Sequence, residues 1–257
     1  MDDEDYHRKA LQCIYRTYGL LCDYDWRMEK ITKRGETISS IYREGYGKIY
    51  KLTCSLQYPA QALCHDIFHN IEEVPTWNPT MLESKVIKKI NSYTEIGQQA
   101  LRCGGGAGLI QSRDFVNLCC WRLLVNGEMQ ESPIDFEHFK QIFKKPSTLM
   151  NEHLENEKFY RKNGRVWLNA AMSLEYPNAP PTMKFVRGEN LISGFAACEV
   201  ENNPDVCIFE WILCLDLKGY IPRSLLDRCY TTFMTDYMQH FQKHVDELRQ
   251  VYINKSC

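Results

Sequence analysis

Hydrophobic residues recur every three or four positions near each end of the chain. Between residues 6 and 22 these positions are Leu11, Ile14, Tyr15, Tyr18 and Leu21. After Pro222 they are Leu226, Cys229, Phe233, Tyr237, Phe241, Val245 and Leu248. Both patterns predict amphipathic helices. At 1.5 Å per residue the second helix, about thirty residues long, would span roughly 45 Å, so it needs a broad apolar surface to lie on.

Alternating apolar and polar positions predict nine β-strands between these helices. Their expected ranges are 31–34, 37–42, 48–56, 83–90, 93–100, 114–125, 166–174, 192–199 and 206–218. A shorter helix is expected from Pro59 to about Ile71, because Pro75 and Pro79 prevent its continuation. The pattern indicates the α+β class, with helices covering one side of an antiparallel sheet.

Two segments interrupt this pattern. Residues 103–108 contain four glycines too closely spaced for a dinucleotide-binding fingerprint, with no helix after them, so we expect a flexible loop. Residues 127–165 are charged and contain Pro133 and Pro146. We interpret residues 1–257 as a single domain with an insertion at about 127–165.

Composition excludes several classes of protein. The 257 residues are 44% hydrophobic and carry a net charge of -2, so no overall field attracts nucleic acid or an anionic membrane. The twelve cysteines are scattered, include the adjacent pair Cys119 and Cys120, and form no CxxC motif. We therefore expect a reducing compartment, the cytoplasm, and no secretory signal.

Candidate catalytic and metal-binding groups are few. His65 and His69 lie four residues apart beside Cys64 and Asp66, a spacing that can bind zinc, but no third ligand follows from it. A surface or packing role is expected for these histidines, as for His240 and His244. No nucleophile motif is present. We expect no metal, no cofactor and no enzymatic activity.

Three segments of the chain resemble the StAR-related lipid-transfer (START) family, in particular its sterol-binding branch. They are WNP at 77–79, SRDFVN at 112–117, and KFVRGEN at 184–190 together with WILCLDLKGYIPRSLL at 211–226. The resemblance runs from about Asp25 to Arg249, apart from the insertion. It implies a helix-grip fold, in which a curved nine-stranded antiparallel sheet surrounds a tunnel that a long C-terminal helix closes.

The resemblance also implies a function. The chain would bind one sterol, similar to cholesterol, and transfer it between membranes as a monomer that contacts membrane surfaces transiently. Its location would be the cytoplasm, either free or tethered to an organelle membrane within a longer protein. The loop at 103–108 would act as the gate.

Three alternatives remain open. A carotenoid carrier of the same fold is the first. The second is a lipid-gated adaptor that recruits a partner through aromatic residues of the insertion, namely Phe136, Phe139, Phe143 and Tyr160. The third is a small-molecule enzyme of the helix-grip type, since that fold also supports catalysis.

In the sterol branch an acidic residue on one strand faces an arginine on the next. Gln99 and Cys119 occupy these positions here, so the chain lacks both charges, and a paired loss of buried charges can be neutral. Gln99 can hydrogen-bond a hydroxyl group, and Asn117 shares a strand face with Cys119. Arg113 and Asp114 are interpreted as structural. The expected ligand-binding residues are Asn78, Gln99, Phe115, Asn117, Cys119, Leu168, Met172, Phe233 and Tyr237.

Overall fold

The computed structural model describes residues 1–102, 110–130 and 164–256. The loop expected as a gate and most of the expected insertion, including its four aromatic residues, lie outside the described residues. The helices are α1 (Asp3–Leu21), α2 (Ala60–His69), the 3-10 helix η1 (Ile71–Glu73), α3 (Val74–Trp77) and α4 (Arg223–Ser256). The strands are β1 (Arg27–Ile31), β2 (Thr37–Arg43), β3 (Gly47–Leu56), β4 (Met81–Asn91), β5 (Thr94–Leu101), β6 (Arg113–Val125), β7 (Glu128–Met129), β8 (Arg165–Ser173), β9 (Val186–Arg187), β10 (Glu189–Val200) and β11 (Asn203–Asp216).

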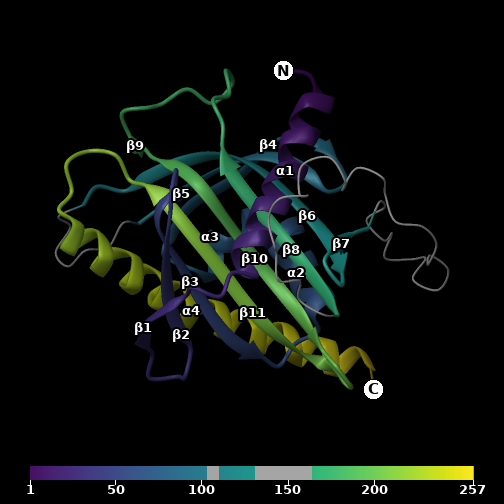
Figure 1. The fold of residues 1–257 in the computed structure, drawn as a ribbon. Helices are drawn as coiled ribbons and strands as arrows, with labels where there is room; N and C mark the ends of the chain where they lie inside the picture. Colours follow the sequence, from purple (N-terminus) through teal and green to yellow (C-terminus); the bar gives the residue numbers. More distant parts are fainter. Residues whose placement is uncertain (103–109, 131–163, 257) are drawn as a thin grey trace.

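The strands form one curved sheet (Figure 1). Nine of them follow the order β1-β2-β3-β11-β10-β8-β6-β5-β4, and every neighbouring pair in that order is antiparallel. The short strands β7 and β9 pair with β6 outside this path. The sheet is not closed, because β1 and β4 are its two free edges. The prediction of a curved nine-stranded antiparallel sheet with a long C-terminal helix is confirmed.

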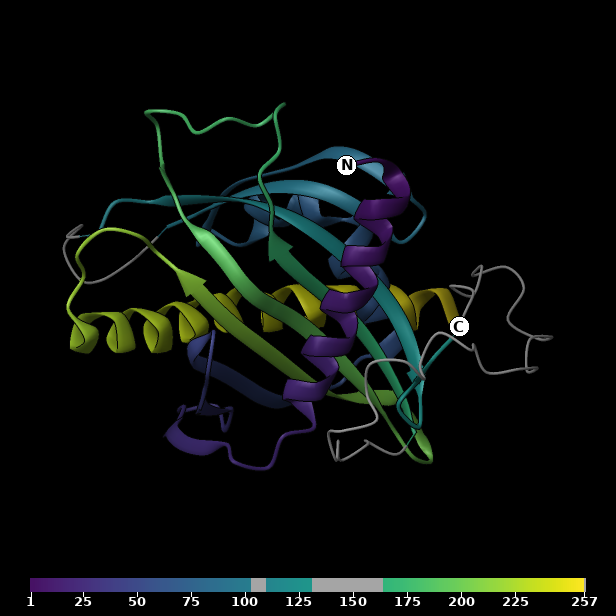
Figure 2. The same cartoon turned by 45° about the horizontal axis from the view of Figure 1, so that its top comes forward.

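Helices cover both faces of the sheet, which differs from the expectation that they cover only one. Helix α4 lies across one face, and α1 lies on the opposite face (Figure 2). Strand β6 explains the difference, since eleven of its thirteen residues are buried and both of its faces therefore need a partner. The alternation along such a strand is too weak to show that one face is open to solvent.

The α1 face of the sheet has its own hydrophobic core. Ile14 of α1 is completely buried there together with Leu118 of β6 and Leu168 of β8. Gly194 of β10 allows α1 to lie close to the sheet, because a Cβ atom at this position would be only 2.6 Å from Cγ2 of Thr17 on α1. Glycine is required at this position because the backbone of β10 directly contacts a side chain of α1.

The opposite core lies between the sheet, α2 and α4. It contains Phe209 and Trp211 of β11 and Met234, Tyr237 and Phe241 of α4. Aromatic rings meet across it, with the Trp211 and Tyr237 ring centroids 4.9 Å apart and those of Phe209 and Phe241 5.1 Å apart. The apolar stripe predicted for the C-terminal helix thus faces the sheet.

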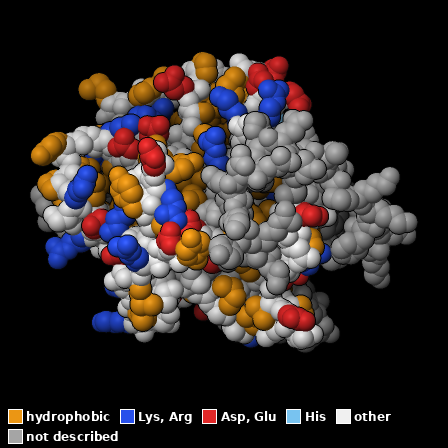
Figure 3. Space-filling model, viewed as in Figure 1, with side chains coloured by type: hydrophobic (Ala, Val, Ile, Leu, Met, Phe, Trp, Pro, Cys, Tyr) orange, Lys and Arg blue, Asp and Glu red, His pale blue; other side chains and the backbone are white. Residues whose placement is uncertain are grey.

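The outer surface in the view of Figure 3 has hydrophobic, basic and acidic side chains interspersed. No helix among the described residues is both long enough and apolar enough to cross a membrane.

Candidate functional site

A cavity of about 110 Å³ lies between the sheet, α2 and α4. Most of its wall is apolar, and its polar residues come from β5, β6, β8 and β10. The lining residues are Ile67, Phe68, Ile71, Met81, Glu95, Gln99, Leu101, Phe115, Asn117, Cys119, Asn169, Ala171, Asn190, Ser193, Gly194, Phe195, Trp211, Leu213, Leu215, Phe233 and Tyr237. The cavity can therefore receive a mainly hydrocarbon group with few polar contacts.

The sheet wall follows from strand register. Glu95 of β5 is paired with Cys119 of β6, which is paired with Ala171 of β8, which is paired with Ser193 of β10. Directly paired residues point to the same face of a sheet. This row crosses the cavity wall from β5 to β10, with a carboxyl group at one end and a hydroxyl group at the other.

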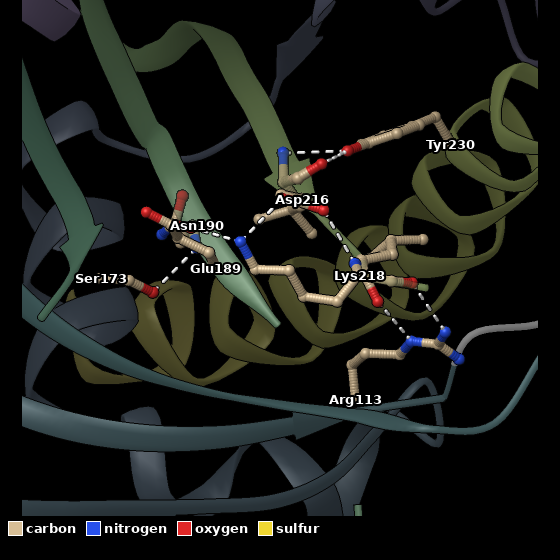
Figure 4. A network of polar contacts seen from close by, with 9 residues as sticks. Arg113, Ser173, Glu189, Asn190, Asp216, Lys218 and Tyr230 are labelled. Atoms are coloured by element: carbon tan, nitrogen blue, oxygen red, sulfur yellow. Dashed lines mark hydrogen bonds and ion pairs between the residues drawn. The ribbon is translucent and has the colours of Figure 1, made fainter. Parts of the chain in front are cut away.

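A chain of hydrogen bonds lies beside this row. Nδ2 of Asn117 donates to Oε1 of Gln99 at 2.9 Å, and the Ser173 hydroxyl donates to Oδ1 of Asn117 at 3.2 Å. The Asn190 backbone N–H donates to the Ser173 hydroxyl at 2.8 Å (Figure 4), and Nδ2 of Asn190 donates to Ser193 at 2.8 Å. Each of these amide groups is thereby oriented, because its rotation would break a hydrogen bond inside the protein.

Arg113 at the start of β6 stabilises the turn that precedes α4 (Figure 4). Its Nε donates to the Leu217 carbonyl at 2.9 Å, and Lys218 in the same turn forms ion pairs with Glu189 and Asp216 at 2.6 and 2.7 Å. Asp114 is 1% exposed and forms an ion pair with Arg187 at 2.8 Å. Arg113 and Asp114 are therefore structural, as expected.

Six of the nine expected ligand-binding residues lie on the cavity wall: Gln99, Phe115, Asn117, Cys119, Phe233 and Tyr237. Leu168 and Met172 do not, because they point to the α1 face, where they belong to the other hydrophobic core. Their neighbours Asn169 and Ala171 line the cavity instead. The predicted alternation of this strand is right, but the face assigned to the cavity is wrong.

Asn78 also lies away from the cavity wall. It is completely buried, its Nδ2 donates to the Tyr237 carbonyl of α4 at 3.3 Å, and its Oδ1 accepts hydrogen bonds from the N–H and hydroxyl of Thr80. Asn78, which was expected to contact the ligand, instead connects α4 to the turn before β4. Both polar atoms of its side chain are hydrogen-bonded within the protein.

Glu95 is a cavity residue that the expected set omits. It is 5% exposed and lies on the cavity face of β5, like its paired neighbour Cys119 on β6. Burial raises the pKa of Glu95 to about 7, while the nearby charge of Lys89 lowers it and that of Glu72 raises it. The cavity thus contains an ionisable residue, although Gln99 and Cys119 occupy the two charged positions of the sterol branch. The sequence could have predicted this position of Glu95, because Glu95 and Gln99 are four residues apart on one strand and therefore point to the same face.

The cysteines and histidines show no sign of reactive or metal-binding chemistry in the described parts of the chain. The ten described cysteines are free, and burial raises the pKa of Cys54 and of Cys207 to about 12. The His65 and His69 rings lie 4.4 Å apart, and burial lowers the pKa of both. No group of three potential metal ligands occurs among the described residues.

Comparison with known families gives one clear match. The model of the START domain matches residues 23–130 and 158–251, which is well over half of the chain. The chain belongs to the START domain family. The match leaves out residues 131–157, within the expected insertion.

Known START proteins resemble the chain over nearly its whole length. The mitochondrial steroidogenic acute regulatory protein of Danio rerio is 24% identical over 241 residues, covering 93% of this chain and 70% of that protein. Its human counterpart is 20% identical over 242 residues, covering 94% and 71%. Both identities are low, so the family assignment depends on the START domain match, and these relatives show that the similarity extends over more than nine tenths of the chain.

Solved structures agree on the fold. Human StAR-related lipid transfer protein 5 superposes with a TM-score of 0.74 at 16% identity, covering 96% of this chain and all of that chain. Human STARD10 superposes with a TM-score of 0.63 at 17% identity, covering 99% and 85%. At these identities the likeness concerns the fold alone.

Proposed function

We propose that this chain takes up one sterol, similar to cholesterol, in the cavity beneath α4 and carries it between membranes. The observation that carries the proposal is a mostly apolar cavity whose wall has one hydrogen-bonded polar cluster, which extends over β5, β6, β8 and β10. Moving a hydrocarbon ligand from water into such a cavity gains about 25 cal/mol for each Å² buried. A sterol offers a large apolar body and a single hydroxyl group.

Gln99 is the first candidate for the hydroxyl contact. Its Oε1 accepts the hydrogen bond from Asn117, so its amide nitrogen is left to face the cavity, where it donates to no described residue. A ligand oxygen that accepts from this nitrogen would complete the hydrogen bonding of the side chain. Aligned polar groups in an apolar pocket fix a ligand's orientation in this way.

Uptake requires the cavity to widen. Its volume of about 110 Å³ is below the roughly 300–1,000 Å³ typical of ligand pockets. We infer that α4 moves, because its residues Phe233 and Tyr237 line the cavity and few polar contacts among the described residues hold the helix to the rest of the domain. These include the Asn78 contact to Tyr237 and the pairing of His244 with Asp66.

The proposal includes the setting of the protein. Residues 1–257 would form one domain that acts as a monomer, contacts membrane surfaces transiently, and works in the cytoplasm either alone or within a longer tethered protein. The small net charge of -2 suits transient contact, since it gives no strong attraction to an anionic membrane.

Lipid extraction tests the proposed cargo directly. The purified protein is incubated with vesicles containing sterols, carotenoids and phospholipids together, re-isolated, and its organic extract is analysed by mass spectrometry. We expect one sterol per protein molecule. Carotenoid in its place would support the carotenoid carrier, phospholipid would reject both ligands, and an extract without lipid would contradict the carrier function.

A further inference from the structure

Glu95 places a carboxyl group in a buried and mostly apolar environment, which is unfavourable unless the group has a polar partner. It is 5% exposed, lies on the cavity wall, and forms no hydrogen bond or ion pair with a described residue. Its paired neighbour on β6 is Cys119, and the cavity residues of α2 and η1, namely Ile67, Phe68 and Ile71, are all apolar. A buried carboxyl group without a partner destabilises the protein unless a ligand or water satisfies it.

The amide of Gln99 lies close to this carboxyl group along β5. Gly97 is between the two residues on the same face of the strand, and a Cβ atom at Gly97 would be 2.8 Å from the Gln99 amide nitrogen. The amide is therefore folded back over Gly97, toward Glu95. Because the Gln99 oxygen is held by Asn117, it is the nitrogen that points into this space.

We propose that Glu95 and the Gln99 amide nitrogen together hold one oxygen atom of the bound lipid. This inference rests on the proposed lipid-carrier function and adds to it a second polar residue. An oxygen placed between the two groups accepts a hydrogen bond from the Gln99 nitrogen and a second one from the neutral Glu95 carboxyl group. A hydroxyl or carbonyl oxygen of a neutral lipid fits this arrangement, whereas a pure hydrocarbon leaves both groups without partners.

The surroundings of Glu95 favour its neutral form when a lipid is bound. Its cross-strand neighbour Lys89 on edge strand β4 is exposed and forms no ion pair with it among the described residues, and Glu72 of η1 adds a like charge. Burial raises the pKa of Cys119 on β6 and of Tyr237 on α4, so both stay uncharged. A lipid that fills the cavity removes further water and disfavours the carboxylate.

Binding of an oxygen-bearing lipid should therefore depend on the protonation of Glu95. Below pH 7 the carboxyl group is mostly neutral and donates its proton to the ligand oxygen. Above pH 7 the lipid must bury a carboxylate or drive its protonation, so the affinity should fall by up to about tenfold for each pH unit. A hydrocarbon analogue should be affected less, because it makes no hydrogen bond to Glu95 in either state.

The test is equilibrium binding of cholesterol and of 5-cholestene, which lacks the hydroxyl group, between pH 5.5 and 8.5. The proteins are the wild type, Glu95→Gln, Glu95→Leu, and Glu201→Gln as a control at an exposed turn. We expect cholesterol affinity to fall with pH in the wild type and in the control. Glu95→Gln should give a flat profile, and Glu95→Leu should lose affinity for cholesterol at least tenfold more than for 5-cholestene.

The outcomes separate this inference from the proposed function. Wild-type binding that is independent of pH, with equal effects of Glu95→Leu on both lipids, would overturn the role of Glu95 and leave the carrier intact. Affinity for cholesterol that rises with pH would also overturn it, because the Glu95 carboxylate would then accept a hydrogen bond from the sterol hydroxyl group in place of the neutral carboxyl group donating one. No binding of either lipid by the wild type, with a normal melting transition, would overturn both proposals.

Discussion

His244 of α4 lies with its Nε2 2.8 Å from a carboxyl oxygen of Asp66 on α2, and the contact is largely buried. The indole of Trp77 stacks on the His244 ring with centroids 4.2 Å apart and planes 3° apart. His244 thus connects the C-terminal half of α4 to α2 through its contact with Asp66 and to α3 through its stacking on Trp77.

Replacing His244 with alanine should loosen α4. Removal of one member of a mostly buried pair costs about 3 kcal/mol. Among the described residues it leaves Asp66 with only its hydrogen bond from Asn70 as a side-chain partner. We expect the melting temperature to fall by about 6–12 °C. Transfer of a fluorescent sterol between vesicles should become faster, because less free energy is needed to separate α4.

His240→Ala on the same helix is the matched control for this variant. His240 forms no ion pair among the described residues, so its replacement should change neither melting nor transfer. Equal transfer rates in His244→Ala and the wild type, despite a lower melting temperature, would contradict movement of α4 as the step that admits lipid.

Glu95 should make the stability of the empty protein depend on pH. Burial raises its pKa from 4.5 to about 7, so the folded state binds more protons than the unfolded state between these values. The free energy of unfolding must then decrease as pH rises from about 4.5 toward 7, by up to about 3 kcal/mol in total. Urea denaturation at pH 5 to 8 should show Glu95→Gln to be less sensitive to pH than the wild type, and an identical slope would argue against a buried, protonated carboxyl group.

Gln99→Leu should reduce discrimination between lipids. Loss of the amide removes one hydrogen bond to the ligand, worth about 1 kcal/mol, so cholesterol affinity should fall roughly fivefold to tenfold. A sterol hydrocarbon should lose less, since it makes no such bond. Competition binding of the two lipids measures the ratio, and equal losses would remove the hydroxyl contact from Gln99.

Filling the cavity should block the site without destroying the fold. Ala171→Leu adds three carbon atoms on the cavity face of β8, whereas Met172→Leu conserves volume on the α1 face. We expect the first variant to bind much less sterol per molecule and the second to bind as the wild type does. Both should keep cooperative melting, and full sterol binding by Ala171→Leu would place the lipid elsewhere.

The segment between β7 and β8 can be removed to test the adaptor alternative. Asn126 and Gly164 are side by side, because the Asn126 N–H donates to the Gly164 carbonyl and the Gly164 N–H donates to the Asn126 side chain, both at 2.8 Å. A short Gly-Ser linker in place of residues 131–163 should leave melting and sterol transfer unchanged. Loss of transfer would assign this segment to the carrier function, and loss of a co-purifying protein would support an adaptor.

Periodicity predicts the larger part of the fold. The helix predicted at 6–22 is α1 (Asp3–Leu21), and the strand predicted at 114–125 is β6 (Arg113–Val125). The first strand was predicted at 31–34 but is Arg27–Ile31. All five of its residues are exposed, so burial imposes no alternation that could mark its position.

The site is harder to predict because alternation does not label the two faces of a strand. In β8 apolar residues occur on both faces, since Leu168 packs toward α1 and Ala171 toward the cavity. Only the position of the helices decides between them. Glu95 was missed for a different reason, because a charged residue in a strand is usually exposed to solvent.

A single layer of backbone separates the cavity from α1. In β10, Gly194 borders the cavity while its Cα faces Thr17 of α1 so closely that no side chain fits. Because β10 has no free space on the α1 side, an occupant of the cavity cannot push this strand outward, and the cavity has to widen on the side of α4. Helix α1 thus fixes the position of β10, and a larger residue in place of Gly194 would separate the helix from the sheet.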